Sequence, residues 1–213
     1  MTHSIRPLLL TAILILPIAT CAWGSPRVYP PNCTVPTQVR AVDTQAGVPD
    51  HAAGQFVIVI RDLVNNVTNG ASVVLDLSSL PDVALCSDQM DPDVTMSCSF
   101  HTVRKFTNAQ GQATFTLLGS STGVNDTPSL GPGHVYANGV FVADVAVSTF
   151  DLDGAGGVGA NDLAIWLADF GSGEPHARSD YDGSGTVGAA DLSEWLGVFA
   201  AGTSTQSCTT SCP

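Results

Sequence analysis

Short runs of alternating apolar and polar residues fill the chain between residues 31 and 150. They are rich in Val, Phe and Thr, and polar turns such as Asn138-Gly139 separate them. A period of two is typical of strands with one buried face. The expected strands are 38–42, 55–61, 72–77, 94–101, 103–107, 112–118, 134–137 and 140–147. This pattern predicts a mainly β chain, arranged as an antiparallel sandwich.

After residue 150 the pattern changes to a helical one, and it occurs twice. Apolar residues first stand at i, i+3, i+4 and i+7, at Leu163, Trp166, Leu167 and Phe170. The same spacing returns 29 positions later, at Leu192, Trp195, Leu196 and Phe199. Each set predicts an amphipathic helix. Because isolated helices of this length are marginal in water, we expect the two apolar stripes to pack on each other.

A loop rich in Asp and Gly precedes each helix. Both loops, 151–162 and 180–191, carry Asp at positions 1, 3 and 12 and Gly at position 6. Calcium takes roughly six to eight oxygen ligands, and such loops supply them from positions 1, 3, 5, 7 and 12, with Gly at 6 for a sharp turn. Segments 151–173 and 180–202 agree at 13 of 23 positions, chiefly these ones and the helix stripe. The repeat therefore predicts two equivalent calcium units.

This order of loop, helix, linker, loop and helix resembles a type I dockerin, a small module that joins secreted proteins to cohesin partners. The resemblance covers about residues 148–202. It implies two bound calcium ions and, in the first loop, the ligands Asp151, Asp153, the carbonyl of Gly157 and Asp162. In the second loop it implies Asp180, Asp182, Ser184, the carbonyl of Thr186 and Asp191. Position 5 of the first loop is Ala155, which has no side-chain oxygen, so we expect the first site to be the weaker.

The resemblance also implies that residues just before the last ligand of each loop contact the partner. They are Ala160, Asn161, Ala189 and Ala190. Because these side chains are small and uncharged, they do not identify the partner. Two roles stay open: attachment to a cohesin-like protein or a cell-surface component, and a module that only caps the preceding domain. A turn that merely imitates a calcium loop is the alternative for a single loop, and the repeat argues against it.

The first residues predict export from the cell. Arg6 precedes an apolar run at 8–16, which Pro17 and small residues follow, as in a secretory signal peptide. We expect residues 1–24 to be removed, with cleavage after Ala22 or Gly24, and lipidation at Cys21 as an alternative. The run is too short to cross a bilayer and no other stretch is long enough. A secreted or cell-surface protein that is not transmembrane is therefore expected.

Composition limits the partners and sets the domain plan. Acidic residues outnumber basic ones by 19 to 7, for a net charge of −12. This balance argues against nucleic acid and anionic lipid as partners. After the signal peptide we expect a β domain at 25–150, a calcium module at 151–202 and a flexible tail at 203–213.

Five cysteines follow Cys21, at Cys33, Cys86, Cys98, Cys208 and Cys212. An odd number leaves one free or paired between chains. In an exported domain we expect a bridge from Cys86 to Cys98, because both lie in one local segment. Cys208 and Cys212 could close a small ring in the tail.

Two segments of the β region, 61–73 and 107–117, are similar to bacterial Ig-like domains of the invasin type. In that family the first segment is a strand, a turn and a strand, and the second is a late hairpin. The similarity implies an Ig-like fold for residues 25–150 and transfers no functional residue.

Candidate catalytic residues are scarce, so we expect a protein that is not an enzyme. The histidines of the mature chain are not beside a Ser or Cys in a nucleophile motif; they are His51, His101, His134 and His176. Glycosidases use paired carboxylates, but Glu174 and Glu194 both lie in or beside the repeats. A nucleophile assembled in space from distant residues stays possible.

Two further features bear on ligands of the β region. Asp88, Asp91 and Asp93 could clamp a cation, although a solvated loop is the simpler interpretation. Aromatic residues lie mostly in predicted strands, where core packing is expected; they are Phe56, Phe100, Phe106, Phe115, Tyr136 and Phe141. The alternative function is an accessory carbohydrate-binding component of polysaccharide degradation, since dockerins commonly tether such modules.

Overall fold

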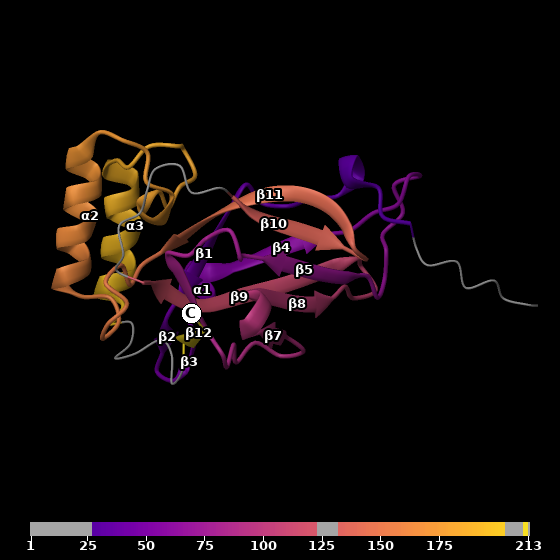
Figure 1. Cartoon of the computed structure of the whole chain (residues 1–213), viewed down its shortest axis with the longest axis horizontal. Helices are drawn as coiled ribbons and strands as arrows, with labels where there is room; N and C mark the ends of the chain where they lie inside the picture. The colour runs from indigo at the N-terminus through magenta and orange to yellow at the C-terminus, as the bar shows by residue number, and fades with distance from the viewer. Residues whose placement is uncertain (1–26, 123–131, 203–210, 213) are drawn as a thin grey trace, which may run out of the picture.

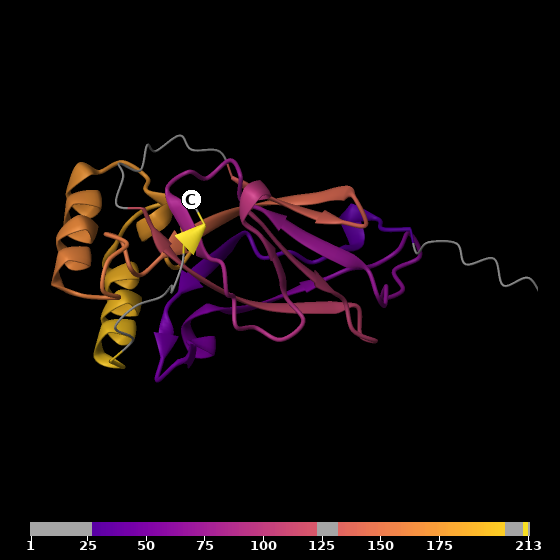
Figure 2. The same ribbon diagram turned by 60° about the horizontal axis from the view of Figure 1, so that its bottom comes forward.

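The computed structural model describes residues 27–122, 132–202 and 211–212. The predicted signal peptide, Cys21, Cys208 and most of the predicted tail lie outside the described residues. A curled β-sheet makes up most of the molecule, and two helices, α2 (Ala160–Ser172) and α3 (Ala189–Ala200), lie together at one end of it (Figures 1 and 2). The prediction of a mainly β chain followed by a small helical segment is confirmed.

Ten of the described strands form one mixed sheet in the order β12-β6-β9-β1-β11-β10-β5-β8-β7, with β4 paired to β9. Their bounds are β1 (Gln38–Val42), β4 (Gln55–Val59), β5 (Ser72–Asp76), β6 (Val83–Cys86), β7 (Thr95–Ser97), β8 (Thr102–Phe106), β9 (Gln112–Ser121), β10 (Gly133–Ala137), β11 (Val140–Thr149) and β12 (Ser211–Cys212). A separate hairpin joins β2 (Thr44–Gln45) to β3 (Val48–Pro49). Short helical turns are η1 (Pro30–Asn32), α1 (His51–Gly54), η2 (Cys98–Phe100) and η3 (Ala177–Ser179).

The purely antiparallel arrangement predicted from the sequence is wrong for β1. This strand runs parallel to β11, with Ala41 opposite Thr149, and parallel to β9, with Val42 opposite Leu118. The two long strands β9 and β11 each pass from one partner to the next along their length, which lets the sheet curl. β1 lies between them and leads directly to the helical end.

Each of the eight predicted strands overlaps an observed one, although β9 and β11 continue beyond the predicted ends at residues 118 and 147. The run at 94–101 ends early, because η2 follows Ser97 and His101 has a left-handed backbone conformation with φ of 50°. Alternation did not reveal β6, because all four of its residues are buried. Period two is visible only where one strand face meets solvent.

The main hydrophobic core lies between the curled faces of the sheet. Val73 and Leu75 of β5 and Val103 of β8 are fully buried there, as the alternation predicts. Phe115 of β9 is also buried and stacks on Phe56 of β4, with ring centroids 5.6 Å apart.

A second hydrophobic cluster joins the helices to the sheet. Trp166 and Trp195 are buried in it, together with Tyr181, and Phe150 stacks on Tyr181 with ring centroids 4.5 Å apart. Val42 and Leu118, from β1 and β9, belong to the same cluster. The predicted boundary at residue 150 therefore falls within a shared core.

The predicted packing of the two helix stripes on each other is only partly right. Both tryptophans lie in the shared cluster, because the sheet end offers them an apolar surface. The outer stripe residues instead remain 45–52% exposed; they are Leu167, Phe170, Leu196 and Phe199. The two phenylalanines stack on their own helix's tryptophan, Phe170 on Trp166 and Phe199 on Trp195.

The expectation of a disulfide between Cys86 and Cys98 is wrong. Cys98 bonds to Cys212, with their Cα atoms 5.0 Å apart, so the small ring of Cys208 with Cys212 is wrong as well. The reason is that β12 pairs with β6 and carries Cys212 back to the sheet. Cys86 is also disulfide-bonded, whereas Cys33 is free and half-buried.

Core packing is also the wrong expectation for several aromatic residues. Phe100, Phe106 and Phe141 are 72%, 55% and 46% exposed. Phe106 and Phe141 lie in strands with their side chains exposed to solvent, whereas Phe100 lies in η2 rather than in a strand. None of the described helices has the length and hydropathy of a membrane span.

Candidate metal centre

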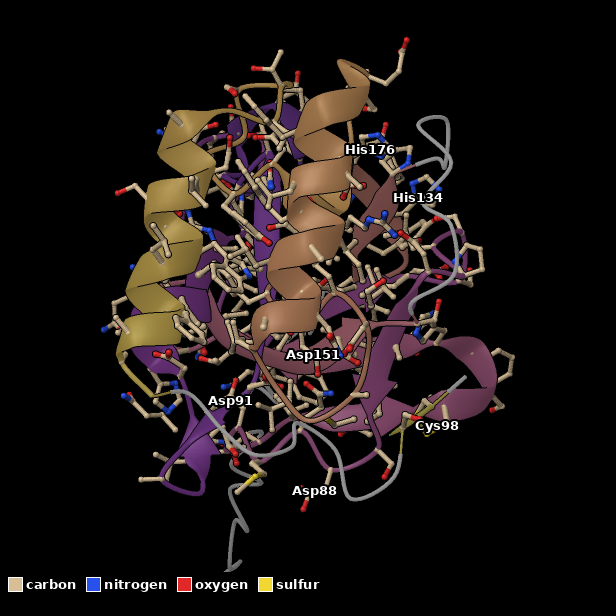
Figure 3. The ribbon with its side chains drawn as sticks, turned by 90° about the vertical axis from the view of Figure 1, so that its left-hand side faces the viewer. Asp88, Asp91, Cys98, His134, Asp151 and His176 are labelled. Atoms are coloured by element: carbon tan, nitrogen blue, oxygen red, sulfur yellow. A yellow bond between two sulfur atoms is a disulfide. The ribbon has the colours of Figure 1, made fainter. Side chains whose placement is uncertain are left out.

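Two carboxylate triads lie in the loops that precede α2 and α3. Asp151, Asp153 and Asp162 each offer an oxygen, and these atoms all lie within 4.8 Å of one another. Three equivalent carboxylates meet the same limit in the second loop: Asp180, Asp182 and Asp191. Figure 3 places Asp151 near the end of α2 at which this helix begins. Positions 1, 3 and 12 of both predicted loops therefore converge in space.

The last aspartate of each loop closes the loop on itself. In the first loop, the Asp162 carboxylate accepts hydrogen bonds from the backbone N–H groups of Leu152, Asp153 and Gly159, at 2.6, 2.9 and 2.7 Å. In the second loop, the Asp191 carboxylate accepts from Tyr181, Asp182 and Gly188, at 2.6, 3.0 and 2.7 Å. The same bonds recur in both copies, so the loop backbone orients the last carboxylate in the same way in each.

The first and third positions are held in the same manner. Asp151 accepts from the N–H groups of Gly154 and Ala155, and Asp153 accepts from Ala155. Asp180 accepts from Ser184 and Gly185, and Asp182 from Ser184. The glycines at position 6 have φ of 81° and 85°, in the left-handed region that favours glycine. The sharp turn expected at this position is present in both loops.

Positions 5 and 7 differ between the loops. The Ser184 hydroxyl donates to the carbonyl oxygen of Thr186 at 3.1 Å, so two predicted ligand oxygens are neighbours in the second loop. In the first loop Gly157 is buried, and Ala155 at position 5 offers no oxygen from its side chain. The second loop thus presents one more side-chain donor to an ion than the first.

Negative charge is crowded at both triads. Burial, followed by the charges of Asp43 and Asp162, raises the pKa of Asp151 to about 7. Burial also raises the pKa values of Asp162 and Asp180. Hydrogen bonds from Ser184 lower the pKa of the exposed Asp182. Clustered carboxylates of this kind are stabilised by a cation.

Both loops are fixed to the sheet. The backbone N–H of Ser121, at the end of β9, donates to the carbonyl of Asp151 at 2.8 Å. Gly154 packs so closely here that a Cβ would lie 2.5 Å from the Ser121 carbonyl oxygen. At the second loop, the Arg40 guanidinium donates to the carbonyl of Tyr181 and forms a salt bridge with Glu194 of α3. The sheet therefore contributes to the position of both triads.

The residues that the dockerin resemblance assigns to partner contact are exposed. Ala160 and Asn161 begin α2, and Ala189 and Ala190 begin α3. Along the same two helices lie the half-exposed outer stripe residues described above. The helices run in opposite directions on the outside of the molecule (Figure 3).

The acidic residues near Cys86 do not form a third triad within the described part of the chain. Asp91 pairs with Lys105 at 3.2 Å and accepts from the backbone of Thr116. Asp88 accepts from the backbone of Met90 and is exposed, as is Asp93. These carboxylates serve local structure.

The fold assembles a Ser, His and Asp grouping that the sequence did not reveal. The Ser172 hydroxyl lies 2.9 Å from Nε2 of His176, whose Nδ1 lies 3.8 Å from the Asp169 carboxylate. However, the hydroxyl donates to the backbone carbonyl of Asp169, and Arg178 and Ser179 donate to the Asp169 carboxylate. These hydrogen bonds connect the end of α2 to η3. The Ser172 hydroxyl already donates its proton to the Asp169 carbonyl oxygen, so the group is explained by local structure.

The other three histidines of the described ranges also form hydrogen bonds. His51 pairs with the Thr116 hydroxyl, His101 with the carbonyl of Leu77, and His134 with Asp144.

No protein-family model, curated protein or solved structure matches this chain. The two carboxylate triads are consequently the strongest pointer to a function.

Proposed function

We propose that this chain is a secreted, non-catalytic calcium-binding protein whose module at residues 151–202 attaches it to a protein partner or to the cell surface. The observation that carries this proposal is the pair of matched triads, each organised by the same set of backbone hydrogen bonds. The β region serves as an Ig-like structural or adhesive module.

The donor set favours calcium over other metals. Every predicted ligand is a carboxylate, hydroxyl or backbone carbonyl oxygen, the kind that calcium prefers, and neither triad contains a sulfur or imidazole ligand. Each loop offers three carboxylates together with a backbone carbonyl, an all-oxygen donor set supplied by the protein, which suits calcium better than magnesium, since magnesium usually keeps several waters and takes only one or two carboxylates. The proposed ligands are those of the dockerin pattern, with the first loop lacking a side-chain oxygen at Ala155.

The attachment role is supported by the surface of α2 and α3. Small exposed residues at both helix starts allow close approach of a partner, and Phe170 and Phe199 offer apolar contact area. Because calcium fixes the loops that begin both helices, partner binding would depend on calcium. A cohesin-like protein is the partner class that the resemblance implies.

Calcium titration after chelation tests the proposal. We expect two binding events in calorimetry and a rise in the unfolding temperature, with a much smaller response to magnesium. A calcium-dependent pull-down with cohesin modules then tests the partner class. A chain whose unfolding temperature does not respond to calcium, and which shows no heat of binding, would contradict the central claim.

The exposed aromatic residues favour a second candidate function, binding of a glycan by the outer face of the sheet. Tyr136 of β10 and Phe141 of β11 lie edge to face, with ring centroids 5.9 Å apart, and His134 lies 6.4 and 5.9 Å from them. On β8 the Arg104 guanidinium lies over the ring of Phe106, 5.4 Å from its centroid. Aromatic faces flanked by hydrogen-bonding groups suit sugar rings.

A glycan screen of the full chain separates the two candidates. Saturable binding to a polysaccharide that Tyr136→Ala weakens, with Tyr29→Ala as the control at an exposed aromatic outside the ring cluster, would support the accessory role. No binding to any polysaccharide, with calcium-dependent attachment retained, would leave the β region as a structural module.

A further inference from the structure

Helix α2 connects the first Asp-rich loop to the residues that lead into the second. Its first turn contains Asp162, whose carboxylate accepts the backbone hydrogen bonds that close the first loop. Its other end lies at the linker between the loops, and Figure 3 places His176 of this linker at the opposite end of α2 from Asp151. Because the backbone of a helix is hydrogen-bonded along its length, α2 moves as one unit.

The far end of α2 holds the residues that come directly before the second loop. Asp169 lies seven residues after Asp162, on the same face of the helix. Its carboxylate accepts two hydrogen bonds from the Arg178 guanidinium, at 2.9 and 2.8 Å, and one from the Ser179 hydroxyl, at 2.6 Å. Asp180, the first proposed ligand of the second loop, follows Ser179 in the chain. The position of α2 therefore sets where the second loop begins.

Helix α3 makes the reciprocal contact. Its first turn contains Asp191, the last proposed ligand of the second loop. One turn later, the indole Nε1 of Trp195 donates to the carbonyl of Phe150 at 3.2 Å. Phe150 comes directly before Asp151, the first proposed ligand of the first loop. Each helix thus carries the last ligand of one loop and holds the residue before the first ligand of the other.

The starts of the two loops also contact each other directly. Phe150 stacks on Tyr181, with ring centroids 4.5 Å apart, and the Tyr181 hydroxyl donates to the carbonyl of Thr149 at 3.0 Å. All three residues are buried. Because protein interiors are close-packed, a displacement at one of these residues is felt by the others.

Asp169 marks a difference between the two repeats. The equivalent position of α3, 29 residues later, is Val198. Asp169 is only 4% exposed, and a buried carboxylate is costly unless it is paired and hydrogen-bonded. Arg178 and Ser179, which pair with it, are buried as well. A buried charge where the other copy has an apolar residue indicates a role beyond core packing.

We propose that the two calcium sites are coupled and that Asp169 is the positioning residue that links them. This inference rests on the proposed function, namely that both loops bind calcium. An ion in the first loop fixes the start of α2, and Asp169 then holds Arg178 and Ser179 so that Asp180 is in place for the second ion. Coupling is reciprocal, so filling the second site raises the affinity of the first by the same factor.

Calorimetric calcium titration of the full chain tests the coupling. The affinity of the first site is measured in the wild-type chain, whose tighter second site fills first. It is measured again in a chain whose second site is silenced by Asp180→Asn and Asp182→Asn. Silencing should weaken the first site roughly 5–150-fold, the usual range for coupled sites. With Asp169→Asn added to both chains, most of this difference should disappear.

Asp91→Asn is the matched control and should leave the difference unchanged. It removes a carboxylate from another buried ion pair, with Lys105, outside both loops. If the wild-type chain binds no calcium, the proposed function fails. If both sites bind calcium and silencing the second does not weaken the first, the coupling alone is overturned. A difference that persists with Asp169→Asn, as with Asp91→Asn, overturns the role of Asp169.

Hydrogen exchange decides the matter should Asp169→Asn not fold. The N–H groups of Ser179 and Asp180 both donate to the carbonyl of His176, at 3.0 and 3.1 Å, so their exchange reports on the linker before the second loop. In the chain with the silenced second site, calcium should slow exchange at the amides of residues 179 and 180 as well as in 151–162. Slowing confined to the first loop and α2 would overturn the proposal.

Discussion

Arg40 of β1 donates hydrogen bonds from Nε and Nη2 to the backbone carbonyl oxygen of Tyr181, 141 residues later in the chain. The same guanidinium forms a salt bridge with Glu194. One side chain of the sheet thus contacts both the second Asp-rich loop and the helix that follows it.

Replacing Arg40 by Gln should destabilise the chain by about 1–3 kcal/mol, because the half-buried carbonyl of Tyr181 loses its donors. Urea unfolding followed by Trp fluorescence measures this loss. Arg104→Gln, at an exposed position over Phe106, is the matched control and should have little effect. Equal stability of the two variants would show that the Arg40 contacts do not hold the second loop.

Introducing an oxygen at position 5 of the first loop should tighten that site. Ala155 is exposed, so Ala155→Asp adds a ligand and a charge without disturbing the core. We expect roughly a tenfold gain in calcium affinity at the first site, measured by calorimetry. Ala164→Asp adds the same charge at an exposed helix position away from the ligands and should change affinity much less; equal gains would mean that only net charge matters.

Stability of the calcium-free chain should fall as pH rises. The pKa of Asp151 is about 7 in the folded chain against 3.8 as its ordinary value, so the folded state holds its proton more tightly. This contribution to stability is fully present below pH 3.8 and is lost as pH rises through 7. Asp162 and Asp180 act in the same direction.

Thermal unfolding in chelator should therefore show a higher midpoint at pH 5 than at pH 8. Saturating calcium should stabilise the chain far more at pH 8, because the ligands must be deprotonated to bind it. If the unfolding midpoint measured in chelator instead rises from pH 5 to pH 8, the raised pKa values assigned to the crowded carboxylates of the loops are contradicted.

The disulfide between Cys98 and Cys212 should contribute strongly to stability. It closes a loop with a sequence separation of 114 residues, for which the chain-entropy model gives about 4–5 kcal/mol. Cys98→Ser with Cys212→Ser should lower the free energy of unfolding by an amount of this order, measured in urea. Cys33→Ser, at the free cysteine, is the control and should cost little.

Strand positions followed from the sequence where a strand is long enough to show alternation and one of its faces meets solvent. β5 alternates between half-buried and buried residues, and the pattern predicted it correctly. β6 was missed because it is buried on both faces, and β12 because two residues carry no period. Parallel pairing of β1 could not be read from its residues, since a strand of alternating side chains suits either direction.

The candidate metal centre likewise combines features that the local sequence predicts with features that depend on the fold. Spacing alone predicted that Asp151, Asp153 and Asp162 converge, because a twelve-residue loop brings its own positions together. Arg40 is far from the second loop in sequence, and no local pattern marks it. Its contact with the carbonyl of Tyr181 depends on how β1 is placed in the sheet.

The sequence by itself determined the two loops, the helices that follow them and the strands with one exposed face, because each depends on contacts within about a dozen residues. Only the tertiary structure decided the disulfide partner of Cys98, the exposure of the outer helix stripes, and the attachment of the first loop to β9 and of the second loop to β1. These features join segments distant in the chain, and the curl of the sheet and the burial of the two tryptophans against it select them.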